Sequence, residues 1–214
     1  MREPDLVTTW SAAWAAVFTA VLVWSAIEPY DYVTWLLEVS PAVAGAAVLA
    51  GTRKVFPLTT LVYVFALIHC VILIVGGHYT YAEVPLGHWF AEQFDLQRNN
   101  YDKLGHFAQG FVPALIAREL LIRKQVVNGA AWRNFLIVSF CLGFSAFYEL
   151  IEWWVALLSD EAAESFLGTQ GYVWDTQSDM FYALIGASLA LLLLGRWHDA
   201  QLEDRGFADR NAGS

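Results

Sequence analysis

Three pairs of ionisable residues lie in or beside apolar segments at helical spacing. The pairs, which are four, three and four residues apart, are Asp102 and His106, Glu149 and Glu152, and Asp175 and Asp179. Side chains three or four residues apart lie on one face of a helix. The spacing therefore predicts three short faces of carboxylate and imidazole groups. Three polar neighbours complete the set of candidate site residues: Lys103, Gln109 and Gln177.

Carboxylates together with an imidazole can hold a divalent metal ion. Oxygen ligands suit Mg, Ca or Mn, and an added histidine suits Zn or Fe. All six paired residues are candidate metal ligands, although the residue types do not identify the metal. A histidine flanked by carboxylates can also act as a general base or proton relay. We therefore assign candidate catalytic roles to His106, Glu149 and Asp102.

Each of these residues also has a purely structural interpretation. Asp102 and Lys103 could form a capped helix start that the helix dipole stabilises. Lys103 could instead bind a phosphate group or pair with Asp102. Glu149 and Glu152 could pair with Lys103 or Arg98 and so determine the register between helices. The histidines His69 and His88 fit packed or interfacial positions better than metal-ligand positions.

The elements that carry these residues are membrane helices. The chain of 214 residues is 57% hydrophobic and 15% charged, whereas a soluble domain is nearer half apolar and a quarter charged. The apolar residues gather in blocks of about 20, the length of helix that crosses ~30 Å of hydrocarbon. We predict an all-α, polytopic membrane bundle surrounded by lipid. A net charge of −9, with no basic stripe, argues against a nucleic-acid partner.

The hydrophobic pattern predicts about six transmembrane helices in one membrane domain, residues 1–195. The expected spans are 10–27, 32–50, 55–75, 101–121, 134–157 and 179–195, followed by a polar, solvated tail at 196–214. We expect Gly76 and Gly77 to close the third span. Between the third and fourth spans we expect a short interfacial helix with one apolar face, formed by Leu86, Trp89, Phe90 and Phe94.

The distribution of basic residues predicts an orientation. With six spans, 10 of the 12 Lys and Arg residues fall on the side of the termini, and only Arg98 and Lys103 fall on the other. The positive-inside rule then places both termini in the cytoplasm. On this topology every ionisable residue within a span lies in the outer half, and the cytoplasmic halves hold none. The three polar faces would then look into one cavity between the last three spans.

Several longer motifs resemble the YjdF-like bacterial inner-membrane proteins, a family of uncharacterised function. They are GGHYTY at 76–81, YDKLGHF at 101–107, YELIEWW at 148–154, GTQG at 168–171 and WDTQSDM at 174–180. This resemblance runs in order along nearly the whole chain and implies the bacterial inner membrane. Asp102, Lys103 and His106 also resemble the VanZ-like membrane proteins, which are linked to glycopeptide (teicoplanin) tolerance. That shorter likeness implies a role at the outer envelope.

Three hypotheses for the function follow. The first is an enzyme of the outer leaflet that acts on a lipid or envelope precursor, with His106 as acid or base and the carboxylates holding a metal. The second is a non-catalytic scaffold or binding module in which the polar residues hold helices together. The third is an ion- or proton-coupled transporter. It is disfavoured because no internal repeat is visible and because, on this topology, the cytoplasmic halves of the spans lack polar groups.

Overall fold

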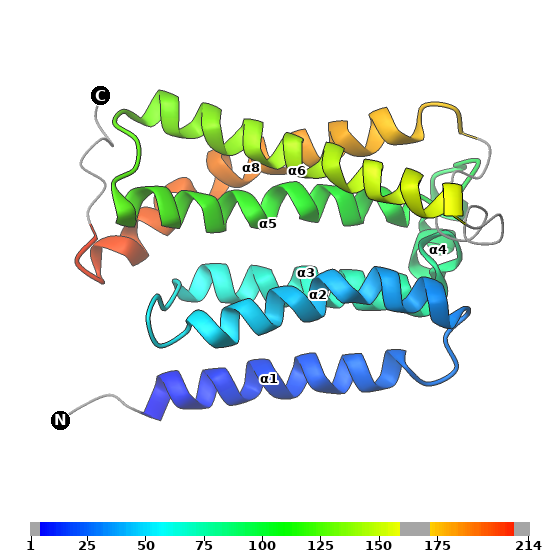
Figure 1. Cartoon of the computed structure of the whole chain (residues 1–214), viewed down its shortest axis with the longest axis horizontal. Coiled ribbons are helices and arrows are strands. Elements are labelled where there is room, and N and C mark those ends of the chain that lie inside the picture. The colour runs from blue at the N-terminus through cyan, green and yellow to red at the C-terminus, as the bar shows by residue number, and fades with distance from the viewer. Residues whose placement is uncertain (1–4, 159–171, 208–214) are drawn as a thin grey trace.

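The computed structural model describes residues 5–158 and 172–207, and every regular element in those ranges is a helix. Six long helices run lengthwise beside one another (Figure 1): α1 (Asp5–Ser25), α2 (Tyr32–Thr52), α3 (Thr60–Tyr79), α5 (Tyr101–Lys124), α6 (Ala130–Leu158) and α8 (Asp175–Glu203). Two short helices, η1 (Tyr81–Glu83) and α4 (Pro85–Gln93), connect α3 to α5. The prediction of an all-α bundle is confirmed.

Four of the long helices, α2, α3, α6 and α8, are long and apolar enough to cross a membrane. In α1 a shorter apolar stretch, Ser11–Ser25, is described. Each of the six expected spans corresponds to one long helix. The number of helices that cross the membrane is therefore approximately six. The chain is therefore a multi-pass membrane protein.

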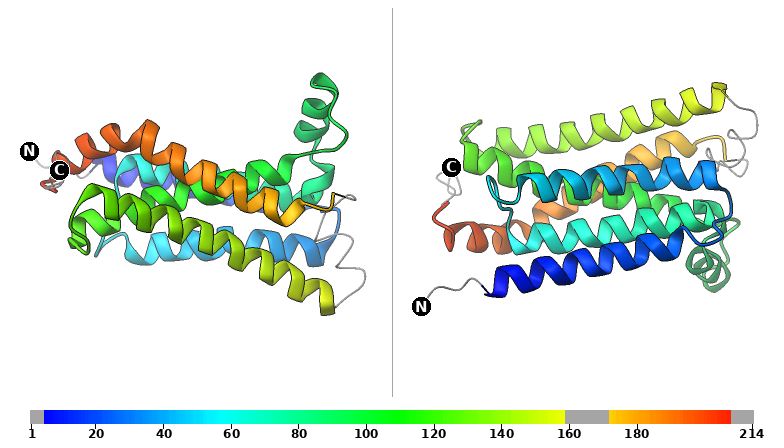
Figure 2. Two further views of the ribbon diagram at one scale, coloured as in Figure 1. Left: turned by 90° about the horizontal axis from the view of Figure 1, so that it is seen from above. Right: turned by 60° about the horizontal axis from the view of Figure 1, so that its bottom comes forward.

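The most polar long helix, α5, lies in the interior of the bundle. It packs against α3, α6 and α8, while α1 and α2 pack on α3. The two views in Figure 2 show the same arrangement from other sides. Intramembrane polar residues normally face the interior of a bundle, because lipid offers them no hydrogen bonds. The central position of α5 explains how it accommodates Asp102, His106 and Gln109.

The two ends of the bundle differ in composition. Helix α1 begins and α8 ends at one end, which we call the terminal end, and α4 lies at the other, the α4 end (Figure 1). Helix α4 stands out from the bundle (Figure 2, left). Its apolar side chains Leu86, Trp89 and Phe90, together with Phe94, are about half exposed. The predicted short helix with an apolar face is thus present.

The third span differs from its predicted bounds at both ends. Helix α3 begins at Thr60 rather than at residue 55, because Pro57 disfavours helical backbone just before it. The prediction that Gly76 and Gly77 close this helix is wrong, since α3 continues to Tyr79. Both glycines are buried because neighbours approach closely. A Cβ on Gly77 would lie 2.9 Å from Val39 Cγ2, and one on Gly76 would overlap the ring of Tyr81.

The last helix is longer than expected at both ends. It begins at Asp175, so Asp175 and Asp179 share one helix face as predicted. It continues to Glu203, so the expectation that a solvated tail begins at residue 196 is wrong for residues 196–203. His198 and Leu202 are fully buried and hold this extension against the bundle. Packing of these two side chains against the bundle thus keeps the last two turns helical, although the neighbouring residues are polar.

Candidate functional site

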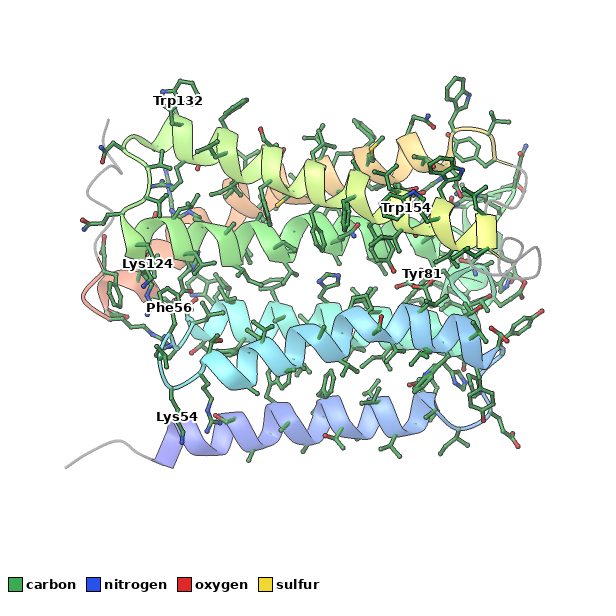
Figure 3. The ribbon with its side chains drawn as sticks, viewed as in Figure 1. Lys54, Phe56, Tyr81, Lys124, Trp132 and Trp154 are labelled. Carbon is green, nitrogen blue, oxygen red and sulfur yellow. The ribbon has the colours of Figure 1, made fainter. Side chains whose placement is uncertain are left out.

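A cavity of about 240 Å³ lies toward the α4 end, among α2, α3, η1, α5, α6 and α8. Its polar lining residues come from all six elements: Glu38, His69, Tyr81, Asp102, His106, Gln109, Tyr148, Glu152, Asp175 and Asp179. The labelled Tyr81 in Figure 3 lies between the α2–α3 pair and the α5–α6 pair at this end. Residues that are more than 100 positions apart in the chain thus share one cavity. The expected cavity lay between the last three spans, whereas α2, α3 and η1 also line this one.

Two groups of possible metal ligands form at or beside this cavity, and Glu149 is the one member that does not line it. His106, Glu149 and Glu152 make one group, and Asp102, Asp175 and Asp179 make the other. Within each group the ligand atoms all lie within 4.8 Å of one another. The first group joins α5 to α6 and the second joins α5 to α8. Each group therefore depends on two helices that pack together.

His106 is oriented by its neighbour on the same helix. Its Nδ1 lies 3.0 Å from Gln109 Oε1, and because that oxygen only accepts, Nδ1 carries the proton. In the neutral ring Nε2 then has a free lone pair, and it lies 3.6 Å from Glu149 Oε1. Two acceptor atoms thus face each other. A second group that holds the ring of a histidine in one tautomer is typical of metal-ligating histidines.

Two carboxylate oxygens at the site lack a hydrogen-bond donor. Glu149 is 8% exposed and Asp179 is 4% exposed, and within the described residues Glu149 Oε1 and Asp179 Oδ1 have no hydrogen-bond partner. Burial of an unsatisfied carboxylate oxygen costs free energy, so such atoms call for an explanation. A bound cation or proton would satisfy both.

The all-aspartate group already has a counter-charge. Arg98 Nη2 pairs with Asp175 and, at 3.2 Å, with Asp102. Burial opposes the charge of this guanidinium, but the hydrogen bond with Asp175 and the charge of Asp102 outweigh it, so the pKa of Arg98 is raised. The expected pairing of Arg98 with Glu149 or Glu152 is not what the described residues show. The group around His106 therefore has the greater need of a cation.

The comparisons with known proteins match nearly the whole chain. Residues 10–200 match the family described as "Predicted membrane protein (DUF2238)". The inner membrane protein YjdF of Escherichia coli (strain K12) is 50% identical over 188 residues, which cover 88% of this chain and 90% of that protein. The chain belongs to this family. No solved structure matches it, and the comparisons give no support to the likeness to VanZ-like proteins.

Four residues that line the cavity of this DUF2238 chain were not among the predicted site residues: Glu38, His69, Tyr81 and Tyr148. Glu38 is a charged residue inside an apolar span, and that was a usable signal. His69 also lies inside a span, and its Nε2 is buried without a partner among the described residues. No spacing rule singles out the two tyrosines. Burial, followed by the nearby Glu38, raises the pKa of Tyr81 well above its ordinary value, so its hydroxyl stays protonated.

Two predicted polar neighbours do not line the cavity. Gln177 is exposed on α8. Lys103 Nζ donates to Asn100 Oδ1 at 2.6 Å and lies 5.1 Å from the centre of the Tyr172 ring. Asp102 accepts from the backbone N–H of Lys103 at 2.8 Å. It does not cap α5, whose N-cap is Asn100 without a side-chain cap hydrogen bond, but it lies in the first turn, where the helix dipole favours a negative charge. Residues 159–171, which include Asp160, Glu161 and Glu164, lie outside the described residues.

The prediction that the halves of the spans near the termini hold no ionisable residue is wrong. Glu119 of α5 is 0% exposed near the terminal end. Its carboxylate accepts from Thr59 N and Oγ1, from Arg123 Nη1 at 2.7 Å, and contacts His198 Nε2 at 3.2 Å. The neighbouring Arg118 pairs with Asp199. These partners explain how a carboxylate is accommodated there, and hydropathy alone did not reveal it.

Proposed function

We propose that this protein is a metal-dependent membrane enzyme that acts on a lipid or a lipid-linked envelope precursor. The observation that carries this proposal is the pair of facing acceptors, His106 Nε2 and Glu149 Oε1, at 3.6 Å. Glu152 belongs to the same group of ligand atoms. Two acceptors this close repel unless a cation or proton lies between them, and an imidazole with two carboxylates suits a divalent metal.

The metal, when bound, would polarise an oxygen of the substrate or of a water molecule. His106, Glu149 and Glu152 would hold it, and Gln109 would keep the imidazole in the ligating tautomer. Asp179 has a buried oxygen without a partner within the described residues and lines the same cavity. Its role would be to accept a proton. Asp102 and Asp175 would position Arg98, whose charge suits a phosphate or carboxylate on the substrate.

We infer that the α4 end faces the outside of the inner membrane. Most basic residues lie on helices and turns at the terminal end, among them Arg53, Lys54, Arg123 and Lys124, and the positive-inside rule supports a cytoplasmic location for that end. The cavity would then serve substrates of the outer leaflet.

Metal analysis of the purified full-length protein tests this proposal. We expect about one divalent metal per chain, lost on substitution His106→Ala or Glu149→Gln, because each removes a ligand. His88→Ala and Glu92→Gln are matched controls, since both residues are exposed on α4. Lipid and envelope-precursor profiles of cells that carry each variant at equal protein levels supply the functional measurement.

One observation favours the scaffold as the second candidate. Arg98 joins Asp102 of α5 to Asp175 of α8, and such a bridge can serve the packing of two helices alone. If neither the wild-type protein nor any variant binds metal, and the lipid profiles are unchanged, this candidate is supported over the enzyme.

The transporter receives less support. Buried apolar residues of α5, including Phe111, Val112 and Leu115, separate the cavity from the polar cluster around Glu119.

A further inference from the structure

The cavity has an apolar part in addition to its polar groups. Six apolar side chains line it: Pro41 of α2, Leu73 of α3, Ala82 of η1, and Phe144, Phe147 and Ile151 of α6. The carboxylates Asp102 and Asp175 lie in the first turns of α5 and α8, close to the α4 end. The lining therefore combines charged groups near the α4 end with apolar side chains, as an amphiphilic ligand requires.

The apolar part reaches the depth of lipid acyl chains. At 1.5 Å per residue, Phe144 lies roughly 21 Å along α6 from its Leu158 end, and Pro41 lies roughly 14 Å along α2 from its start. Half of the hydrocarbon core of a bilayer is about 15 Å thick. Pro41 thus lies at the level of the acyl chains of one leaflet, and Phe144, the middle residue of the 29-residue α6, lies near the centre of the bilayer. Asp102 and Asp175 lie near the level of the headgroups.

The cavity reaches the lipid-facing surface of the bundle. Phe144 and Phe147 line it, yet they are 43% and 51% exposed. They lie on α6, which packs on α5 and α8, while the opposite wall comes from α2, which packs on α3. Glu38 of α2 and Tyr148 of α6 both line the cavity. The side of the cavity between α2 and α6 is therefore where a molecule from the bilayer could enter.

We infer that an acyl chain of a membrane lipid enters between α2 and α6 and occupies the apolar part of the cavity, which places the headgroup against the His106 and aspartate groups. This inference rests on the proposed function, since it names the route and the form of its substrate. At about 240 Å³ the cavity is smaller than most small-molecule pockets, which hold ~300–1,000 Å³. It therefore accommodates part of one chain while the rest of the lipid stays in the bilayer.

Photolabelling of the full-length protein tests the inference. The protein is reconstituted in vesicles of phosphatidylethanolamine and phosphatidylglycerol that carry a diazirine in one acyl chain, and labelled residues are mapped by mass spectrometry. We expect a label at Gln109, which is buried on α5, lines the cavity and lies deeper along the helix than His106. Labels confined to the outward faces of α1, α2 and α6 would overturn the inference.

Two substitutions that fill the cavity sharpen the test. Phe144→Trp and Leu73→Trp should lower α5 labelling by roughly tenfold, the loss expected when room for one or two methylenes is removed. Phe140→Trp and Ile68→Trp are matched controls, because both residues are exposed on the same helices and do not line the cavity. If labelling of α5 is equal in all four variants, the chain does not enter this cavity.

The test separates this inference from the proposed function. Labelling needs no metal, so α5 labels in protein that binds no metal would support lipid entry and contradict the enzyme proposal. Bound metal with no α5 labels would support the metal site and contradict lipid entry.

Discussion

Two buried glutamates of this bundle have opposite environments. Glu119 is surrounded by donors, namely Thr59, Arg123 and His198. Glu149 has one oxygen without a donor among the described residues and faces the lone pair of His106. A carboxylate with a full set of partners contributes to stability, whereas one with an oxygen that lacks a donor is available for a ligand. Burial alone does not distinguish these roles, but the partners do.

Loss of the charge on Glu119 should destabilise the protein. We expect Glu119→Gln to lower the free energy of unfolding by about 3–5 kcal/mol, because removal of one partner leaves Arg123 buried without its counter-charge. Thermal unfolding of the purified protein in detergent measures this loss. Glu203→Gln is the matched control, since Glu203 is exposed near the end of α8. Equal melting temperatures for the two variants would contradict a structural role for Glu119.

At the scale of elements, the pairing of α5 with α8 brings the polar groups together. Neither Gly110 of α5 nor Gly186 of α8 has room for a Cβ, which would overlap the carbonyl oxygen of Ala183 and of Phe107, respectively. Small residues at such crossings let two membrane helices approach closely. This close crossing places Asp102 of α5 beside the aspartates of α8.

A methyl group at the crossing should separate the two helices. We expect Gly110→Ala to cost about 1–3 kcal/mol of stability, the usual range for overpacking, and to weaken metal binding. Gly143→Ala is the matched control, because a Cβ there meets nothing within 4 Å and α6 is helical at that position. Alanine is better than glycine in such a helix by about 0.5–1 kcal/mol. Thermal unfolding and metal content of both variants are the measurements. If both melt alike, the crossing does not require glycine.

At the scale of the whole molecule, the two ends of the bundle differ in composition, and this difference indicates how the protein is oriented across the membrane. The α4 end has exposed aromatic side chains and the candidate site, while the terminal end has most of the basic residues. An amphipathic helix can lie in the headgroup region with its apolar face in the bilayer, and the exposed apolar side chains of α4 suit that position. The position of α4 beside the cavity suits a substrate that resides in that leaflet.

Cysteine labelling tests which end of the bundle faces the cytoplasm. A membrane-impermeant maleimide should label Gln93→Cys in intact spheroplasts and should label Lys54→Cys only after lysis, because the two residues lie on opposite sides. Native Cys70 and Cys141 are buried and provide the unlabelled background. Labelling of Lys54→Cys in intact spheroplasts would reverse the proposed orientation.

The fold was largely predictable because lipid restricts it. A segment of about 20 apolar residues has to be helical to satisfy its backbone in the bilayer. The predicted bounds were inaccurate where local rules met tertiary packing. Gly76 and Gly77 looked like a helix end, yet the ring of Tyr81 and the side chain of Val39 explain them as sites of close packing. Glu119 was overlooked because its partners come from other helices.

Sequence alone determined the class of protein, the helical faces and the residues Asp102, His106, Glu149, Glu152, Asp175 and Asp179 as candidates, since hydropathy and helical period are local properties. Only the tertiary structure decided which of them meet, that Arg98 pairs with the aspartates, and that Glu38, His69 and Tyr148 share the cavity. The physical reason is that the cost of a buried charge depends on its neighbours in space. Those neighbours come from helices far apart in the chain.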